Sequence, residues 1–414
     1  MSVFEFGSYR LDVEERRLYR GREIIHLRAK VFETLVVLVS HAGRLVRKEE
    51  LLQWVWPRTN VEENNLDRSI SHLRKVFSEE PPYIETVPRQ GYRFLPEVRE
   101  LGAKTAVNPP IVLRTGPVVP RQEICSFTAV DGARIAYSKA GNGPPLVKAA
   151  NWLNHLEFEW CSPIWSHWMA ELTRHHTLIR YDERGNGLSD WNVTDFSFDA
   201  WLRDFETLVD TVGLERFPVL GISQGGAVAV AYAALHPERV SHLILYGAFA
   251  RGSLVRNSPT ELERRDALMS LIRLGWGKDN PAFRQIWSTI FMPEATPEQS
   301  GWFNELQRIT TSPENAVHLL EEIGKINVVD QLPKVTCPTI VFHSRRDSVI
   351  PFSEGQLVAA RIVGAKFVEL PSRNHLVIPP EPGWDIFIQH LGDFLRWHKE
   401  PASKPSVLRV SSAG

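Results

Sequence analysis

The chain has 414 residues, of which 43% are hydrophobic and 23% are charged, and its formal net charge is -1. This composition is typical of a globular protein and excludes a strongly basic or low-complexity chain. The longest apolar runs are far shorter than the ~20 residues that cross a bilayer, and the charged N-terminal segment lacks the apolar core of a signal peptide. We therefore expect a cytoplasmic protein of two domains, with no membrane partner.

The first part of the chain predicts strands, three helices and a terminal hairpin. The two strand-like segments, the three segments with helical spacing of apolar residues and the hairpin pattern cover, in order, residues 3–12, 16–27, 29–43, 47–57, 61–77 and 83–98. The first two helices are expected to end at Gly43 and Pro57, and Gly91 is expected at the turn of the hairpin. This order of elements is that of a winged helix-turn-helix domain.

The third helical segment combines an apolar stripe with a polar surface. The stripe is formed by Leu66, Ile70, Leu73 and Phe77. A helix with a polar, hydrogen-bonding outer face can enter the major groove of DNA. The stretches "LRAKVFETLVVLVSHAGRLVRKEELLQWVWP", "VEENNLDRSISHLRKVF" and "IETVPRQGYRF" closely resemble the OmpR/PhoB-type winged-helix DNA-binding domain, also found at the start of CadC-like regulators. The resemblance implies that the third helix enters the major groove of double-stranded DNA and that the wing reaches the minor groove.

Positions within this motif supply the candidate DNA-binding residues. The candidates on the third helix are Asn64, Arg68, Ser69, His72 and Lys75, and those on the wing are Arg89 and Arg93. The first hundred residues hold nearly equal numbers of basic and acidic side chains, so the alternative is a solvated helix face in a protein-interaction domain. Domains of this family usually act in pairs, so the resemblance also implies a homodimer on DNA.

Composition divides the chain at a stretch rich in proline, glycine and small residues, 99–123. This stretch predicts a linker between a domain over 1–98 and a second domain over 124–400. Residues 401–414 are predicted to form a disordered tail. Apolar strands alternate with helices through the second domain, which predicts an α/β fold with a mostly parallel sheet. Helical sequence over about 250–330 interrupts that alternation.

A GxSxG pattern at Gly221, Ser223 and Gly225 follows an apolar strand and opens a helix of small residues. Such a pattern arises by chance in about one chain in ten of this length, so its context is what favours a nucleophile elbow. Asp347 and His375 follow later strands, in the order along the chain that this kind of site requires. The sequence therefore predicts Ser223 as nucleophile, His375 as base and Asp347 as the acid that orients the base.

The stretches "YDERGNGLSD", "GISQGG", "RRDSVIP" and "NHLVI" resemble the α/β-hydrolase superfamily and are most similar to small esterases, haloperoxidase-like and lactonase-like members. The similarity spans about residues 125–397. It implies an α/β-hydrolase fold whose oxyanion hole uses the backbone N–H groups of Gln224 and Trp152. It also implies that the helical interruption is a cap over the site.

Two departures from the family pattern bear on the site. Glu183 lies where a small or apolar residue is more common, and Ala150 and Asn151 replace the usual His-Gly pair before Trp152. The Trp152 indole is expected to crowd the pocket. Several apolar cap residues either line an acyl or aryl pocket or pack the cap onto the core: Met269, Trp276, Trp287, Phe291 and Trp302.

The leading hypothesis is a transcriptional regulator whose hydrolase domain binds, and hydrolyses, a small ester, lactone or acyl ligand. The alternatives are an esterase that the winged helix localises or oligomerises, and a hydrolase-fold receptor without turnover. The sequence contains no CxxC, HExxH or Walker pattern, so we expect no metal and no cofactor. The isolated residues Cys125, Cys161 and Cys337 are expected to be buried free thiols.

Overall fold

The computed structural model describes residues 3–13, 16–21, 23–25, 27–55, 63–77, 82–87, 90–96, 98–101, 119–278 and 281–397. Its contacts divide the chain into two compact units, Met1–Leu113 and Arg114–Gly414. The predicted tail over 401–414 and most of the predicted linker over 99–123 lie outside the described residues.

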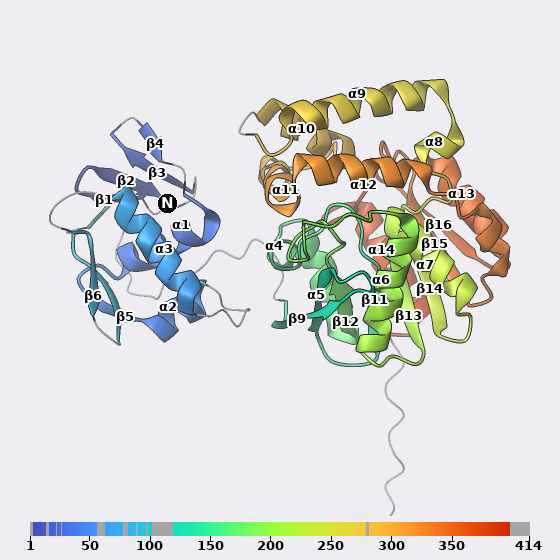
Figure 1. Ribbon diagram of the computed structural model, residues 1–414, viewed down its shortest axis with the longest axis horizontal. Coiled ribbons are helices and arrows are strands. Elements are labelled where there is room, and N and C mark those ends of the chain that lie inside the picture. The colour runs from blue at the N-terminus through green and yellow to red at the C-terminus, as the bar shows by residue number, and fades with distance from the viewer. Residues whose placement is uncertain are drawn as a thin grey trace, which may run out of the picture. The chain divides into compact units, whose positions relative to one another are not determined.

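The first unit contains two antiparallel sheets and three helices (Figure 1). Its elements are β1 (Val3–Phe6), β2 (Tyr9–Asp12), β3 (Arg17–Arg20), β4 (Glu23–Ile25), α1 (Ala29–Ser40), β5 (Leu45–Arg47), α2 (Lys48–Val55), α3 (Glu63–Val76), β6 (Ile84–Val87), β7 (Gly91–Phe94) and β8 (Arg99–Leu101). The larger sheet has the order β4-β3-β2-β1-β8, and the smaller one has the order β5-β7-β6. The predicted strands, helices and wing hairpin are therefore present.

The apolar stripe of α3 packs into the core of this unit, where Leu66, Ile70 and Leu73 are buried. The prediction that a linker starts at residue 99 is wrong for the first residues of that stretch. Residues 99–101 form β8, which pairs antiparallel with β1. Backbone pairing with β1 makes β8 the edge strand of the larger sheet and holds this segment in the first unit.

The second unit is built on an eight-stranded sheet of order β16-β15-β14-β13-β11-β12-β10-β9. Its strands are β9 (Gln122–Thr128), β10 (Arg134–Ala140), β11 (Pro145–Lys148), β12 (Thr177–Tyr181), β13 (Phe217–Ile222), β14 (Val240–Tyr246), β15 (Thr339–Ser344) and β16 (Lys366–Leu370). The hairpin β9–β10 is antiparallel, β10 pairs antiparallel with β12, and the other pairings are parallel. The strands from β11 to β15 are almost wholly buried, as expected for a sheet covered on both faces.

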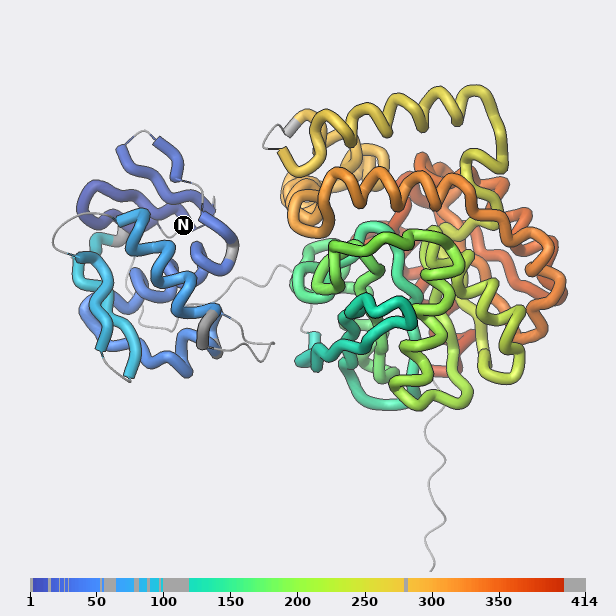
Figure 2. The backbone as a smooth tube through the Cα atoms, in the orientation of Figure 1, coloured from blue at the N-terminus to red at the C-terminus, as the bar shows by residue number. Residues whose placement is uncertain are grey.

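The helices of this unit are α4 (Leu156–Trp160), α5 (Trp165–His175), α6 (Phe198–Thr211), α7 (Gln224–Leu235), α8 (Ser253–Arg256), α9 (Pro259–Gly275), α10 (Pro281–Phe291), α11 (Pro297–Thr310), α12 (Pro313–Lys325), the 3₁₀ helix η1 (Val329–Lys334), α13 (Phe352–Arg361) and α14 (Pro382–Leu395). Helices α8 to α12 fall between β14 and β15, where the cap was predicted. Figures 1 and 2 show α9 to α12 gathered on one side of this unit, beyond the sheet. The carboxyl ends of the parallel strands meet at one edge, so residues that follow different strands come together there.

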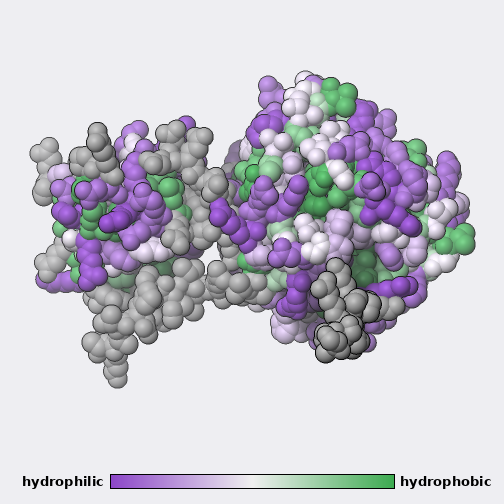
Figure 3. Space-filling view, turned by 90° about the horizontal axis from the view of Figure 1, so that it is seen from below, coloured by the Kyte–Doolittle hydropathy of each residue, from purple (hydrophilic) through white to green (hydrophobic). Residues whose placement is uncertain are grey.

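Helices in the described part of the chain are too short or too polar to span a membrane. The three cysteines are free, but only Cys337 is buried. The expectation of buried thiols is wrong for Cys161, which is exposed, and for Cys125, which is half-buried. Exposed large apolar side chains, such as Leu235, Leu274 and Val363, are far apart in the sequence. In the view of Figure 3, apolar areas of the second unit alternate with hydrophilic ones.

Candidate functional site

Ser223 lies on the turn that joins β13 to α7, with φ 53° and ψ -127°. Residues other than glycine rarely adopt these backbone angles, so contacts with neighbouring residues must stabilise this conformation at Ser223. The Ser223 N–H donates to the Tyr246 carbonyl of the neighbouring strand at 3.0 Å. A Cβ on Gly225 would lie 2.4 Å from the Ala150 carbonyl oxygen, so only glycine lets the turn come this close to the segment that follows β11. The geometry is that of a nucleophile elbow.

The base and its orienting acid are joined directly. His375 Nδ1 hydrogen-bonds to Asp347 Oδ2 at 2.6 Å, which places the proton on Nδ1 and leaves Nε2 free to accept one. Asp347 Oδ1 accepts from the backbone N–H groups of Val349 and Ile350 at 2.8 and 3.1 Å. Burial opposes ionisation of Asp347, but the attraction of His375 and these hydrogen bonds keep its pKa below the ordinary value.

The base lies beside the elbow. Gly247 directly follows Tyr246, the residue whose carbonyl accepts from Ser223, and a Cβ on Gly247 would lie 2.9 Å from the His375 ring. The His375 Nε2 atom is buried and has no hydrogen-bond partner among the described residues. Asp347 and His375 are therefore joined as predicted, whereas no hydrogen bond joins His375 to Ser223 in this state. Catalytic hydrogen bonds often form only when substrate is bound.

The predicted oxyanion donors come from two elements. Gln224 is the first residue of α7, whose N-terminus carries partial positive charge. Trp152 lies in the loop between β11 and α4, which we call the oxyanion loop. This loop is tied down by Asp182, which directly follows β12. Its carboxylate accepts from Asn154 Nδ2 at 2.9 Å and from the Leu156 N–H at 3.1 Å. Asp182 thus shapes the loop that presents the Trp152 N–H.

Aromatic cap residues close over the base and the oxyanion loop. The Trp152 ring stacks on Trp276 at 5.5 Å and meets Trp287 edge-on at 5.3 Å, and Phe291 meets the His375 ring at 5.5 Å. The cavity between these walls has room for about one water molecule. A larger ligand therefore does not fit unless the walls of this cavity move, and the crowding expected from the Trp152 indole is present.

Glu183, one of the two departures from the family pattern, is buried beside Gln224. The side chain is only 2% exposed, and its carboxyl lies beside the side-chain amide of Gln224 without forming a hydrogen bond of normal geometry. Burial raises the pKa of Glu183 to about 8, and the nearby carboxylate of Asp204 adds to this effect, while Gln224, Arg184 and Lys148 oppose it. A largely neutral acid therefore lies beside the residue expected to stabilise the oxyanion.

On the first unit, α3 presents a polar face and is fixed to the wing. Asp67 accepts from the Tyr92 hydroxyl at 2.7 Å, and burial together with this contact raises the pKa of Tyr92 to about 12. Arg74 donates to the Ile84 carbonyl at 3.1 Å and to Thr86 Oγ1 at 2.6 Å. The orientation of α3 against β6 and β7 is therefore held by charged hydrogen bonds.

The predicted DNA-binding residues differ in exposure and in their contacts. Arg68 and Lys75 are exposed and His72 is half-buried on α3, while Arg93 on β7 is half-buried and paired with Glu85 at 3.0 Å. The placement of Ser69 on the DNA-facing surface is wrong. Ser69 is 5% exposed, and its hydroxyl donates to the Asn65 carbonyl inside the unit. Arg89 and the side chain of Asn64 lie outside the described residues.

The supporting contacts of three residues were not predicted from the sequence: Asp67, Arg74 and Asn154. Each contacts a segment that is separate in the chain, and helical or strand periodicity carries no signal for such contacts. Among the cap residues singled out, Phe291 and Trp302 line cavities, Trp276 and Trp287 pack around Trp152, and Met269 is buried without lining either cavity described. No cluster of His, Cys, Asp or Glu able to hold a metal ion occurs in the described ranges.

A mostly parallel sheet with a serine on the strand–helix turn and a His–Asp pair at the same edge defines an α/β hydrolase. In agreement, residues 153–382 match the sequence profile of the family "alpha/beta hydrolase fold", and residues 21–94 match that of "Transcriptional regulatory protein, C terminal". The chain belongs to the α/β-hydrolase fold family and carries an OmpR/PhoB-type regulator domain at its N-terminus.

Individual relatives match one unit or the other. The AB hydrolase superfamily protein YisY of Bacillus subtilis (strain 168) is 26% identical over 238 residues, which are 57% of this chain and 86% of that protein. The transcriptional regulator HilA of Salmonella typhimurium is 39% identical over 93 residues, which are 22% of this chain and 17% of that protein. The solved esterase EaEST from Exiguobacterium antarcticum has a TM-score of 0.56 at 23% identity, over 66% of this chain and 98% of that one, and shows the shared fold.

The buried acid Glu183 yields a prediction about pH and stability. Its pKa is raised in the folded chain, so between about pH 4.5 and pH 8 the folded state holds a proton that the unfolded state has released. Stability should therefore fall as pH rises through this window, by up to about 1.4 kcal/mol per pH unit from this group. Glu183→Gln should remove this part of the slope, measured by urea unfolding followed by tryptophan fluorescence at several pH values.

The exposed residue Glu215, just before β13, offers a matched control. Glu215→Gln should keep the pH slope of the parent chain. If Glu183→Gln also kept that slope, Glu183 would be ionised in the folded state and its neutral character would be refuted.

Proposed function

We propose that the chain is a DNA-binding transcriptional regulator whose hydrolase unit binds and hydrolyses a small ester, lactone or acyl compound. The observation that carries the catalytic part is the His375–Asp347 pair with a free Nε2 beside the strained Ser223 turn. The regulatory part rests on the OmpR/PhoB-type domain and on the exposed basic side chains of its third helix. We propose a cytoplasmic location, because the proposed target of the regulator is DNA.

In the proposed reaction, Ser223 Oγ attacks the ligand carbonyl while His375 Nε2 takes the hydroxyl proton. The imidazolium that forms is stabilised by Asp347 through the Nδ1 hydrogen bond. The N–H groups of Gln224 and Trp152 donate to the oxyanion. Collapse of the intermediate breaks the ester bond, and the leaving oxygen takes the proton from His375. Water then attacks the acyl-enzyme with His375 as base, releasing the acid and restoring Ser223.

The proposed signal is a change in the position of the cap when the ligand binds. Cap helices pack on the oxyanion loop and the base, so a ligand held at Ser223 must favour a different cap position from the one described here. A ligand shifts such an equilibrium only through its different affinities for the two states. We propose that this shift changes how a dimer of the chain occupies DNA, with the stretch between the units as linker.

A receptor without turnover is the second candidate. It is favoured by the missing hydrogen bond between Ser223 and His375 and by the filled pocket. In this case the same residues bind the ligand, and Ser223 contributes contacts without forming an acyl-enzyme.

Labelling with a fluorophosphonate separates these candidates. The probe should modify the full chain at Ser223, and Ser223→Ala should abolish the label. His375→Ala should lower the labelling rate by at least a hundredfold, because a serine without its base is a weak nucleophile. Mass spectrometry of the labelled peptide measures the outcome. Absence of label on a folded chain would leave the receptor as the function.

DNA binding is tested through α3. Arg68→Ala and Lys75→Ala should each weaken binding to a selected duplex on the order of tenfold, because each removes a charge from the proposed groove-facing surface. Fluorescence anisotropy at fixed salt measures the affinity. Arg361→Ala, an exposed charge removed from α13 in the hydrolase unit, is the matched control. Equal affinities for all three variants and the parent chain would refute the role of α3.

A further inference from the structure

The oxyanion loop departs from the family pattern at Asn151, which directly precedes Trp152. Asn151 is 4% exposed and lines the cavity that His375 also lines. Its Oδ1 atom accepts a hydrogen bond from Nζ of Lys148, the last residue of β11. The side chain that distinguishes this loop is therefore tied to the strand from which the loop begins.

Lys148 is itself buried, with 3% of its surface exposed. An ammonium group in the interior is costly unless it is paired and hydrogen-bonded. Its nitrogen lies 5.3 Å from the centroid of the Trp165 ring, within the range of a cation–π interaction. The Glu159 carboxylate attracts it as well, although the ion pair of Glu159 at 2.6 Å is with Arg180. The hydrogen bond to Asn151 is therefore part of what stabilises a charge in this position.

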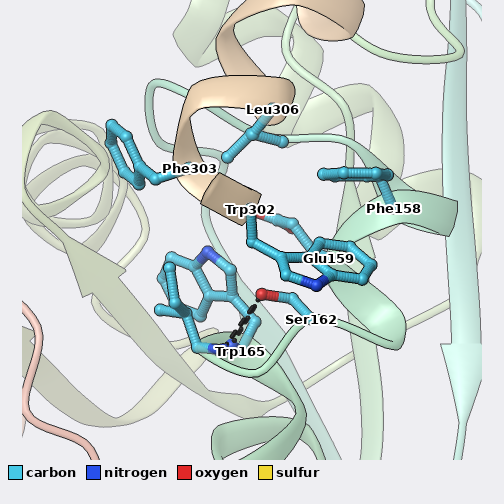
Figure 4. Close-up of a pocket in the computed structure, with 8 residues that line it drawn as sticks. Phe158, Glu159, Ser162, Trp165, Trp302, Phe303 and Leu306 are labelled. Atoms are coloured by element: carbon cyan, nitrogen blue, oxygen red, sulfur yellow. Dashed lines mark hydrogen bonds between the residues drawn. The ribbon is translucent and has the colours of Figure 1, made fainter. Parts of the chain in front are cut away.

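The neighbours of Lys148 lie among apolar side chains. Figure 4 shows Glu159 of α4 and Trp165 of α5 beside aromatic side chains of the cap helix α11. The pocket between them has no room for a water molecule. Water in that pocket therefore cannot screen the Glu159 charge, and its interactions with the buried cations are stronger than they would be at the surface.

The charge on Lys148 depends on groups from three segments: Glu159 on α4, Arg180 on β12, and Asp182 and Glu183 directly after β12. Burial lowers the pKa of Lys148 to about 8, and Arg180 acts in the same direction, while the three carboxyl groups oppose the shift. Lys148 therefore keeps its proton at neutral pH and releases it in mildly alkaline solution, well before an exposed lysine would.

We propose that Lys148 is a positioning residue of the oxyanion hole, because its ammonium group holds Asn151 and thereby the backbone that presents the Trp152 N–H. The inference rests on the proposed function and adds a means of regulating it, since the site weakens when Lys148 loses its proton. A charged donor forms a stronger hydrogen bond than a neutral amine, so the loop is held less firmly in mildly alkaline solution. Lys148 acts through the loop and not on the ligand itself.

A double-mutant cycle on the full chain tests this role. The rate at which a fluorophosphonate labels Ser223 reports on the oxyanion hole, because that hole holds the oxygen of the probe during attack. Lys148→Met and Asn151→Ala should each slow labelling about tenfold, as expected when a charge-assisted hydrogen bond is lost. The double variant should be no slower than Lys148→Met alone, since both changes remove the same contact. Slowing factors that multiply, or an unchanged rate in Asn151→Ala, would overturn the role.

The pH dependence separates positioning from a merely structural role. The ratio of the parent rate to the Lys148→Met rate should fall as pH rises through about 8, because only the parent chain loses a charge there. Using the ratio cancels the titration of His375, which both chains share. Glu183 titrates in the same range, so the ratio is measured again in a Glu183→Gln background, where the fall should persist. A ratio that stays constant across this range would refute regulation by Lys148.

Lys139→Met is the matched control. Lys139 also lies near an aromatic ring, 5.8 Å from the centroid of Tyr137, but it belongs to β10 and not to the strand that leads into the oxyanion loop. Lys139→Met should be labelled at the parent rate. If circular dichroism shows that Lys148→Met does not fold, Asn151→Ala takes its place, because the ratio of the parent rate to its rate should show the same fall with pH.

The outcome is separable from that of the proposed function. A parent chain that is labelled at Ser223, with equal rates in the Lys148 and Asn151 variants, would refute the positioning role and leave the hydrolase intact. A folded parent chain that is not labelled would refute turnover, and with it the role of Lys148.

Discussion

Ser223 keeps a left-handed backbone conformation between β13 and α7, and the rest of the catalytic arrangement is organised around that turn. The turn is held by a hydrogen bond to Tyr246 and by the close approach of Gly225 to Ala150, so it connects the elbow to both neighbouring strands. These neighbours lead directly to the other parts of the site. Ala150 lies just after β11, in the segment that continues into the loop carrying Trp152, and β14, which ends at Tyr246, is followed by Gly247, which lies against the base. Strain at one residue is thereby spread over three strands of a buried sheet.

Several charged side chains are buried close to the catalytic turn and the oxyanion loop. Asp182 holds the loop, Arg180 pairs with Glu159, and Arg184 makes two hydrogen bonds to Asp204. Buried ion pairs often add little net stability, because desolvation offsets their attraction. What they supply here is a set of polar groups in fixed positions around the proposed ligand site. Glu183 and Glu159 each retain a carboxyl oxygen without a hydrogen-bond partner among the described residues.

In the winged-helix unit, hydrogen bonds from charged side chains also fix the positions of secondary-structure elements. Asp67 and Arg74 tie α3 to the wing, so the two elements proposed to contact DNA have a fixed relation to each other. This removes the cost of orienting them on binding. It also explains why Asp67 and Arg74, although polar and on the third helix, are committed to contacts within the unit.

The sequence by itself determined the classes of both units, since the apolar stripe of α3, the alternation of strands and helices, the GxSxG pattern and the order of Ser223, Asp347 and His375 can all be read along the chain. It also identified Trp152 as a residue that would crowd the site. Only the tertiary structure decided that Ser69 is buried, that β8 extends the first unit, that the cap fills the pocket, and that Glu183 is buried beside Gln224. The physical reason is that burial and pairing of a polar side chain depend on segments distant in the chain. Periodicity reports only which face of its own helix or strand a residue occupies.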